Sequence, residues 1–212
     1  MTPNPFYEID GLRPVVQPSA FVHPQAVVIG DVFIGANVYV GPNASLRGDF
    51  GRIVLADGSN VQDSCTMHAF PGEMVFVGED GHIGHGAILH GCRIEKNAMI
   101  GIGAVILDGA IIGESAIVAA KALVAAGFIA PPQTLTIGMP AKTTRPLSAE
   151  EIAWKMAGTQ AYHRLAGRCR DSLRPCQPRQ RAELKRRQIA DIHPQEMMVK
   201  TKHRARTGAK SP

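Results

Sequence analysis

Large aliphatic residues recur every six positions along much of the chain. One block of them consists of Ile94, Ile100, Ile106, Ile112, Val118 and Val124. An alanine stands four places after each of the first five, and an earlier block consists of Val22, Val28, Ile34, Val40 and Leu46. Neither an amphipathic helix nor the strands of a sandwich keep a small residue at a period of six. The pattern is typical of a parallel β-helix, in which three hexapeptides form one triangular coil.

The sequence therefore predicts an all-β fold, a left-handed parallel β-helix over residues 1–147, with a C-terminal α-helix over residues 148–172. Ser148 and Glu151 have the spacing of a capping box at the start of that helix. The apolar residues spaced for one helix face are Ile152, Met156, Tyr162 and Leu165. We expect this face to pack back along the coil.

Basic residues are concentrated at the C-terminal end. The formal net charge is +5, and residues 173–212 contain eleven Lys or Arg against three acidic residues. We expect a basic tail that is solvated and partly disordered. The alternative is that the tail binds an anionic partner, such as a phosphorylated cofactor or a nucleic acid. No aromatic residues are interleaved with the basic ones, so a nucleic-acid partner is not expected.

Hydropathy and cysteine content indicate a cytoplasmic protein. No stretch approaches the roughly 18 apolar residues of a membrane span, and the segment MTPNPFYEID lacks the basic and apolar regions of a secretory signal. We therefore expect neither membrane insertion nor secretion. The four cysteines form no CxxC pair, which favours reduced, mostly buried thiols over a disulfide scaffold.

The repeat is interrupted twice in its middle. Three residues are inserted before Leu55 and four before Val77, and we expect both insertions to form extruded loops. When the insertions are discounted, His68 and His90 lie one full coil apart and should stack. Adjacent strands are about 4.8 Å apart, so two such imidazoles can share a zinc ion. The same counting places Arg47 one coil below His68.

His85 lies in the hexapeptide before that of the second stacked histidine, around a corner of the triangle. It should not reach the same metal within one chain, but it can reach the metal of a neighbouring subunit in a three-fold trimer. Asp63 lies one coil below His85 with Gln62 beside it, so we expect both to enter from the side of His85. His82 falls elsewhere, with a supporting or a surface role.

Three segments, SLRGDFG, NVQDSCTMH and IGHGAILHGC, resemble the γ-class carbonic anhydrase-like proteins, and the resemblance spans residues 6–172. Within that family the chain is most similar to the branch that serves phenylacetate degradation, with a close relative in carnitine metabolism. The resemblance implies a homotrimer with a metal site at each interface between protomers. It implies zinc, with iron or cobalt as alternatives, bound by His68, His85 and His90.

The resemblance also implies roles for the residues around the metal. Arg47 and Asp49 would pair across the subunit boundary. Gln62 and Asp63 would contact the metal-bound water, and all four residues would act in catalysis. The expected substrate contacts are Phe50, Asn60 and Tyr162.

Two departures from the family pattern bear on the reaction. Phe50 stands where the archetypal carbonic anhydrase has an acidic residue, and AFPGEMVF replaces its acid-rich loop. Glu73 is the one carboxylate in that loop, either a proton shuttle or a solvated charge, so fast CO2 hydration is not expected. We expect hydrolysis of CoA thioesters in phenylacetate degradation, with an acyl-CoA as substrate and metal-bound hydroxide as nucleophile.

Three other functions stay open at this point. CO2 hydration is the direct alternative within the same family. An acyltransferase is the second, because IGMPAKTTR is similar to the segment that often follows the coil in CoA-dependent hexapeptide-repeat enzymes. The third is a non-catalytic assembly subunit that keeps the metal for structure.

Overall fold

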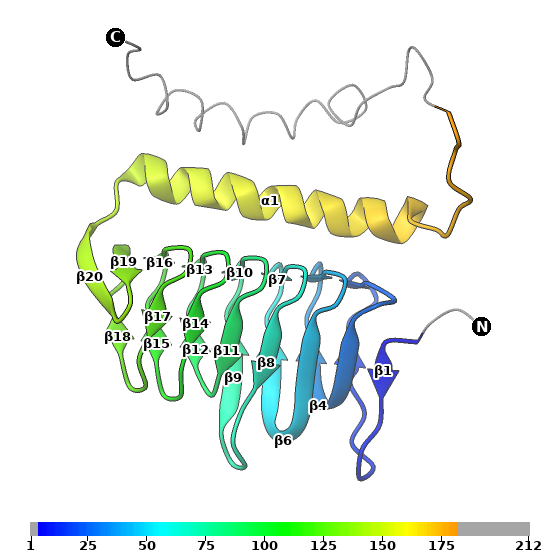
Figure 1. The fold of residues 1–212 in the computed structure, drawn as a ribbon, viewed down its shortest axis with the longest axis horizontal. Coiled ribbons are helices and arrows are strands. Elements are labelled where there is room, and N and C mark those ends of the chain that lie inside the picture. The colour runs from blue at the N-terminus through cyan, green and yellow to red at the C-terminus, as the bar shows by residue number, and fades with distance from the viewer. Residues whose placement is uncertain (1–3, 182–212) are drawn as a thin grey trace. The chain divides into compact units, whose positions relative to one another are not determined.

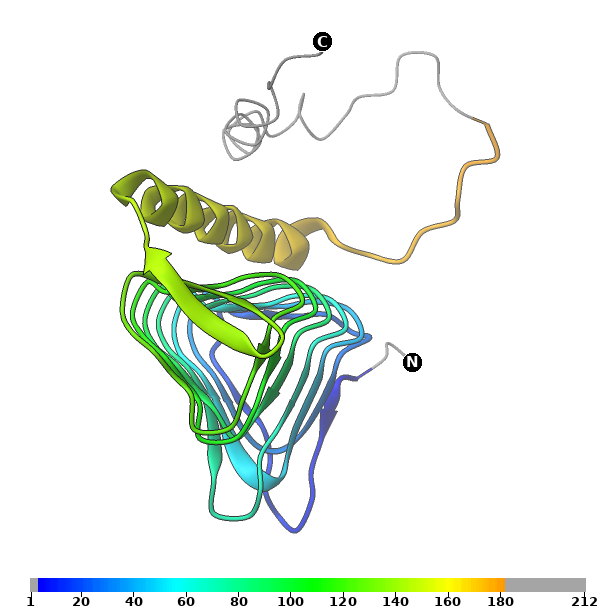
Figure 2. The ribbon, with the colours of Figure 1, turned by 60° about the vertical axis from the view of Figure 1, so that its left-hand side comes forward.

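The computed structural model describes residues 4–181, and the residues up to Asp171 form one compact unit. Its chain winds into a triangular coil, and a single helix runs along one side of the coil (Figure 1). Figure 2 shows the three sides of the triangle end on. The predicted parallel β-helix with a C-terminal helix is confirmed.

The strands are short, and most have two residues. They are β1 (Phe6–Tyr7), β2 (Val15–Val16), β3 (Phe21–Val22), β4 (Val27–Ile34), β5 (Tyr39–Val40), β6 (Ser45–Leu55), β7 (Asn60–Val61), β8 (Thr66–His68), β9 (Met74–Val77), β10 (His82–Ile83), β11 (Ile88–His90), β12 (Arg93–Ile94), β13 (Met99–Ile100), β14 (Val105–Ile106), β15 (Ile111–Ile112), β16 (Ile117–Val118), β17 (Leu123–Val124), β18 (Ile129–Ala130), β19 (Thr134–Gly138) and β20 (Ala141–Pro146).

Each side of the coil is a ladder of these strands. The ladder β8, β11, β14, β17 forms the side that we call the histidine side, and β9, β12, β15, β18 form another. The long strand β6 pairs with both β8 and β9 and so joins these two sides into one sheet. The third side runs β3-β5-β7-β10-β13-β16-β19-β20, and we call it the helix side.

The six-residue repeat places its leading residues inside the coil. Successive leading residues pair in register on neighbouring coils, and those with no exposed surface include Ile94, Ile100, Ile106 and Ile112. The alanines four places after them are buried beside them. Polar corner residues such as Asn37 and Ser115 have a positive φ angle, 56° in each of these two, which lets the chain turn within few residues.

The two insertions differ from each other. The first was expected to form a loop, and this expectation is wrong: the inserted residues are part of the continuous strand β6, which bends below the coil (Figure 1). The inserted residues stay extended because both neighbouring strands still pair with β6. The register with β4 shifts between Gly30 and Val32, and the residues of β6 from Arg52 to Leu55 pair with β9. The second insertion is a loop, as predicted, with a turn at residues 71–72 between β8 and β9.

Helix α1 (Ala149–Ser172) begins with the predicted capping box. The backbone N–H of Glu151 donates to Ser148 Oγ at 3.3 Å, and the backbone N–H of Ser148 donates to Glu151 Oε2 at 3.0 Å. The helix lies along the helix side of the coil, where Tyr162 packs on Tyr39 with ring centroids 5.3 Å apart.

Two of the four predicted apolar residues, Tyr162 and Leu165, pack against the coil beside Phe21 and Tyr39, but none of the four is among the most buried residues of α1. Ile152, Met156, Tyr162 and Leu165 are only partly buried, whereas the most buried helix residues are Lys155, Thr159 and Ala166. The reason is that the strands and corners beneath the helix present polar groups, and these satisfy a lysine and a threonine better than an aliphatic side chain.

Three further expectations concerned the cysteines, a membrane span and the basic tail. Cys65 and Cys92 are buried free thiols, as predicted, while Cys176 is exposed. None of the helices in residues 4–181 has the length and apolar character needed to cross a membrane. Most of the predicted basic tail, residues 182–212, lies outside the described residues.

Candidate metal site

His68 and His90 stack on the histidine side, as the repeat predicts. They end strands β8 and β11, and the parallel register pairs His68 with His90 directly. His68 Nδ1 and His90 Nε2 face each other at 3.3 Å. Because the preceding residues point into the coil, these imidazoles point outward and are only partly buried.

A carboxylate holds the other ring nitrogen of each histidine. Asp49 Oδ1 lies 3.0 Å from His68 Nε2, and Asp108 Oδ1 lies 2.6 Å from His90 Nδ1. An imidazole that donates its N–H to a carboxylate presents the lone pair of its other nitrogen. The two nitrogens that face each other are therefore the ones free to bind a metal.

The spacing of these two nitrogens fits one metal ion. Two nitrogens bound at Zn–N distances of about 2.0–2.1 Å with a tetrahedral angle are about 3.3 Å apart. His68 Nδ1 and His90 Nε2 already have that separation, at 3.3 Å. The residues present thus fit two of the three histidine ligands of a zinc site.

His85 lies apart from this pair. It stands in the turn between β10 and β11, where its Nδ1 is 3.2 Å from Asp63 Oδ2. The turn at residues 85–86 and the length of strand β11 separate it from His90. In the described part of one chain, no three His, Cys, Asp or Glu side chains gather as a potential metal site. If all three histidines bind one ion, the third must come from another chain.

Asp49 is also held by Arg47. Arg47 Nε donates to Asp49 Oδ2 at 3.0 Å, so the pair expected across a subunit boundary forms here within one chain. Burial raises the pKa of Asp49, but the hydrogen bond and charge of Arg47 and the hydrogen bond of His68 outweigh it and lower that pKa. Asp49 is therefore ionised and able to orient His68.

Two phenylalanine rings flank the stacked histidines. Phe50 was expected beside the site, and its ring centroid lies 5.4 Å from that of His68. Phe70 lies 4.8 Å from His90 in an edge-to-face contact and was not predicted. Both rings are more than half exposed, at 61% and 56%. Phe50 lies in the first insertion and Phe70 in the second. An aromatic residue in an insertion, outside the six-residue repeat, is the sequence signal that could have indicated Phe70.

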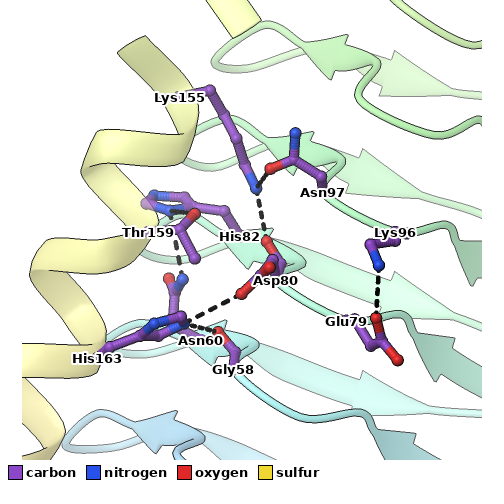
Figure 3. A network of polar contacts seen from close by, with 10 residues as sticks. All are labelled: Gly58, Asn60, Glu79, Asp80, His82, Lys96, Asn97, Lys155, Thr159 and His163. Carbon is purple, nitrogen blue, oxygen red and sulfur yellow. Dashed lines mark hydrogen bonds and ion pairs between the residues drawn. The ribbon is translucent and has the colours of Figure 1, made fainter. Parts of the chain in front are cut away.

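The predicted residues Asn60 and Gln62 lie on the helix side, beneath α1. Gln62 Nε2 donates to Asn60 Oδ1 at 3.1 Å and lies 2.7 Å from His82 Nε2. His82 Nδ1 lies 3.3 Å from Thr159 Oγ1 of the helix (Figure 3). Of the residues expected to share the side of His85, only Asp63 lies beside it. Gln62 is buried against Asn60 and His82, and Asn60, predicted as a substrate contact, has no exposed surface.

Tyr162, the third expected substrate contact, is in this covered region. Its ring packs edge-to-face on His82, with centroids 5.4 Å apart. Burial raises its pKa, with smaller contributions from Tyr39, Asp63 and Cys65, so its hydroxyl stays protonated at neutral pH. A contact between Tyr162 and substrate stays a prediction.

Lys155 also lies in this region, and no sequence pattern indicated it. Its Nζ donates to Asn97 Oδ1 at 2.7 Å and to the carbonyl oxygen of Asp80 at 2.5 Å (Figure 3). Burial lowers the pKa of Lys155 to about 7, against the attraction of Asp80. The lysine ties α1 to two corners of the coil.

Several bacterial proteins resemble this chain over most of its length. The carnitine operon protein CaiE of Citrobacter koseri is 53% identical over 181 residues, which cover 85% of this chain and 92% of that protein. The chain belongs to the CaiE family.

The CaiE family is part of the larger group of hexapeptide-repeat proteins. A family model described as bacterial transferase hexapeptide (six repeats) matches residues 91–126. A Bacillus cereus protein described as a candidate acetyltransferase is 38% identical, with a TM-score of 0.75, and the match covers 76% of this chain and 94% of that one. A hexapeptide transferase family protein from Anaplasma phagocytophilum is 33% identical, with a TM-score of 0.75, over 77% and 97% of the two chains.

Membership of the CaiE family supports part of the resemblance found in the sequence. It agrees with the expected relative in carnitine metabolism. The expected place in phenylacetate degradation stays a prediction, as do the metal and the thioester substrate.

Proposed function

We propose that this protein hydrolyses CoA thioesters at a metal site shared by two subunits of a homotrimer. The observation that carries the proposal is the pair of facing nitrogens on His68 and His90, 3.3 Å apart and each backed by a carboxylate. An acyltransferase that uses one histidine as a base does not need two imidazoles directed at one point.

The residues that would hold the metal are His68, His90 and His85 of the partner subunit. A zinc ion bound by three histidines with one open position lowers the pKa of water to about 7 and so supplies a hydroxide nucleophile at neutral pH. Asp49 and Asp108 keep the first two imidazoles in the required tautomer and orientation.

The other polar residues would act on the attacking water. The water oxygen bonds to the thioester carbonyl carbon, the C–S bond breaks, and the CoA sulfur leaves and takes up a proton. Asp63 Oδ2 contacts Nδ1 of His85, and Gln62 directly precedes Asp63 in the chain. We assign these two residues, from the side of the partner subunit, to orienting the water.

The rings of Phe50 and Phe70 favour an apolar acyl group. They leave more than half of their surface exposed beside the two histidines, and an apolar substrate would cover it. The side chain of Glu73 is exposed, and within residues 4–181 only its backbone makes hydrogen bonds, so CO2 hydration would lack an organised proton relay. Phenylacetyl-CoA is the first substrate to test, and the CoA ester of carnitine is the second because of the carnitine operon relatives.

An acyltransferase is the competing function. The transferase hexapeptide match and the Bacillus cereus structure support it. A transferase releases free CoA only when an acceptor is added, whereas a hydrolase does so in water. A non-catalytic subunit releases none.

Mixed trimers test the shared site. Chains with His68→Ala and chains with His85→Ala should each be inactive, but a mixed trimer contains one intact interface. After random exchange of equal amounts, roughly one quarter of the sites should be restored, measured as bound metal and as CoA release. The matched control mixes His68→Ala with His90→Ala, which come from the same side and restore no site.

The outcomes separate the possibilities. Restored metal with restored CoA release supports the proposal. Restored metal without CoA release from any thioester leaves the shared site and rejects the hydrolase. No restored metal after verified subunit exchange rejects the shared site.

A further inference from the structure

Gln62 is held in one orientation by its neighbours on the helix side. Its Nε2 donates one hydrogen to Asn60 Oδ1 and the other to His82 Nε2. Both hydrogens of the amide are then used. Because the amide is planar and its nitrogen faces Asn60 and His82, Oε1 points outward, away from both of these residues.

The tautomer of His82 follows from the same contacts. His82 Nδ1 lies 3.3 Å both from Thr159 Oγ1 and from the donor Asn60 Nδ2, whereas Nε2 lies only 2.7 Å from Gln62 Nε2. The shorter contact favours Nε2 as the acceptor, so Nδ1 carries the hydrogen and donates it to Thr159 rather than accepting from Asn60. Burial lowers the pKa of His82 to about 3, and the charges of Lys155 and His85 lower it further. His82 is therefore neutral at physiological pH, which leaves Nε2 as an acceptor.

We propose that His82, held by Thr159 of α1, is a positioning residue that fixes the amide of Gln62 with its carbonyl oxygen outward. The opposite amide orientation would set Oε1 against two acceptors, His82 Nε2 and Asn60 Oδ1, and is disfavoured for that reason. The proposal rests on the proposed function, in which Gln62 orients the attacking water. An outward oxygen accepts a hydrogen from that water and directs the lone pair of the water oxygen to the thioester carbon.

This role differs from simple docking of the helix. In Figure 3 His82 lies between the coil and α1, and docking would depend on its Nδ1 contact with Thr159. Positioning of Gln62 depends on Nε2 instead. Two substitutions separate these atoms, because an asparagine side chain reaches about as far as Nδ1 of histidine and a glutamine side chain about as far as Nε2.

The test compares His82→Asn with His82→Gln in the full-length trimer. The His82→Gln variant places an acceptor at Gln62 and should keep kcat within about threefold of the wild type. The His82→Asn variant retains a partner for Thr159 but loses the acceptor, and its kcat should fall about tenfold at an unchanged KM. Comparable activity in the two variants, or greater loss in His82→Gln, overturns the proposal.

A second measurement does not depend on activity. In metal-free protein, the side-chain amide protons of Gln62 should both be protected from exchange with solvent by NMR in the wild type and in His82→Gln. In His82→Asn one of them should lose protection. Equal protection in all three proteins overturns the proposal. If the wild type hydrolyses no thioester, the proposed function fails while this measurement still decides how Gln62 is held.

Discussion

The histidine side and the helix side of the coil use the same residue type in opposite ways. On the histidine side, His68 and His90 are partly exposed and each contacts a carboxylate. On the helix side, His82 is 9% exposed, contacts neutral amides and a hydroxyl, and has the buried Lys155 nearby. The position on the repeat decides which side of the coil an imidazole faces. The group that contacts its ring nitrogens decides whether the imidazole can bind a metal or only make hydrogen bonds.

A carboxylate makes an imidazole a better ligand, because it fixes the tautomer and strengthens the lone pair of the other nitrogen. Burial, with a smaller contribution from the charge of Lys155, instead keeps an imidazole uncharged, so it donates a hydrogen bond from one nitrogen and accepts one at the other. The comparison therefore predicts that changes on the histidine side alter metal binding. Changes on the helix side should alter orientation and stability.

The largest expected effect is loss of the metal on truncation of one ligand. His90→Ala removes one of the two facing nitrogens and should reduce both bound metal and thioester hydrolysis by more than about 100-fold. Elemental analysis and CoA release measure the two effects. His23→Ala is the matched control, since its ring packs near Phe21, away from this pair. Full metal content in His90→Ala would contradict the ligand assignment.

The next largest effect tests whether the carboxylates beside His68 and His90 strengthen metal binding. Asp108→Asn keeps the shape of the side chain at His90 but removes its charge, and should weaken metal affinity about 10- to 100-fold. A competition assay with a coloured chelator measures the affinity. Asp31→Asn is the control, because Asp31 pairs with Arg52 and contacts no histidine. Unchanged affinity in Asp108→Asn would show that the carboxylate does not support the ligand.

The repeat predicts position well and side-chain partners poorly. His68 and His90 were predicted because each directly follows a buried leading residue, Met67 or Leu89, and register then stacks them. Asp108 was missed because an aspartate two places after Ile106 is an ordinary corner residue. Its contact with His90 depends on how the two side chains are directed, and no spacing gives that.

In α1, too, the sequence predicts where the element lies but not which side-chain partners its residues find. A 3.6-residue period located α1 and its cap, but the expected buried face was the apolar one. Tyr162 and Leu165 of that face do pack on the coil, but Lys155 and Thr159 are buried more deeply because Asn97 Oδ1, the carbonyl oxygen of Asp80 and His82 lie beneath them. Such partners come from distant parts of the chain, so they are known only once the coil is assembled.

A smaller effect tests the apolar wall of the histidine side. Phe70→Ala should lower the preference for phenylacetyl-CoA over acetyl-CoA by about tenfold, because the lost ring contacts only the larger acyl group. The ratio of the two kcat/KM values measures this preference. Phe33→Ala is the control, since that ring lies under Arg52, away from the histidines. An unchanged ratio would mean that Phe70 does not contact the acyl group.

The smallest effect concerns Lys155 and the pH dependence of stability. The pKa of Lys155 is lowered to about 7 in the folded protein and has its ordinary value of 10.5 in the unfolded chain. Between these values the unfolded chain holds a proton that the folded protein has released, so stability rises with pH. From pH 7.5 to 8.5 this contribution should be about 1 kcal/mol, and Lys155→Met should lack it.

Urea unfolding of the wild type and of Lys155→Met at both pH values measures the difference. Other groups that face this lysine do not obscure it, because His82 is neutral in both the folded and the unfolded chain above pH 7.5. The buried thiols of Cys65 and Cys92 titrate alike in the two proteins and cancel when they are compared. A wild type that gains no stability relative to Lys155→Met would mean that the lysine keeps its proton under the helix. Lys155 would then donate its two hydrogen bonds as a charged ammonium group. The helix side, like the histidine side, would then be held by hydrogen bonds to a charged group.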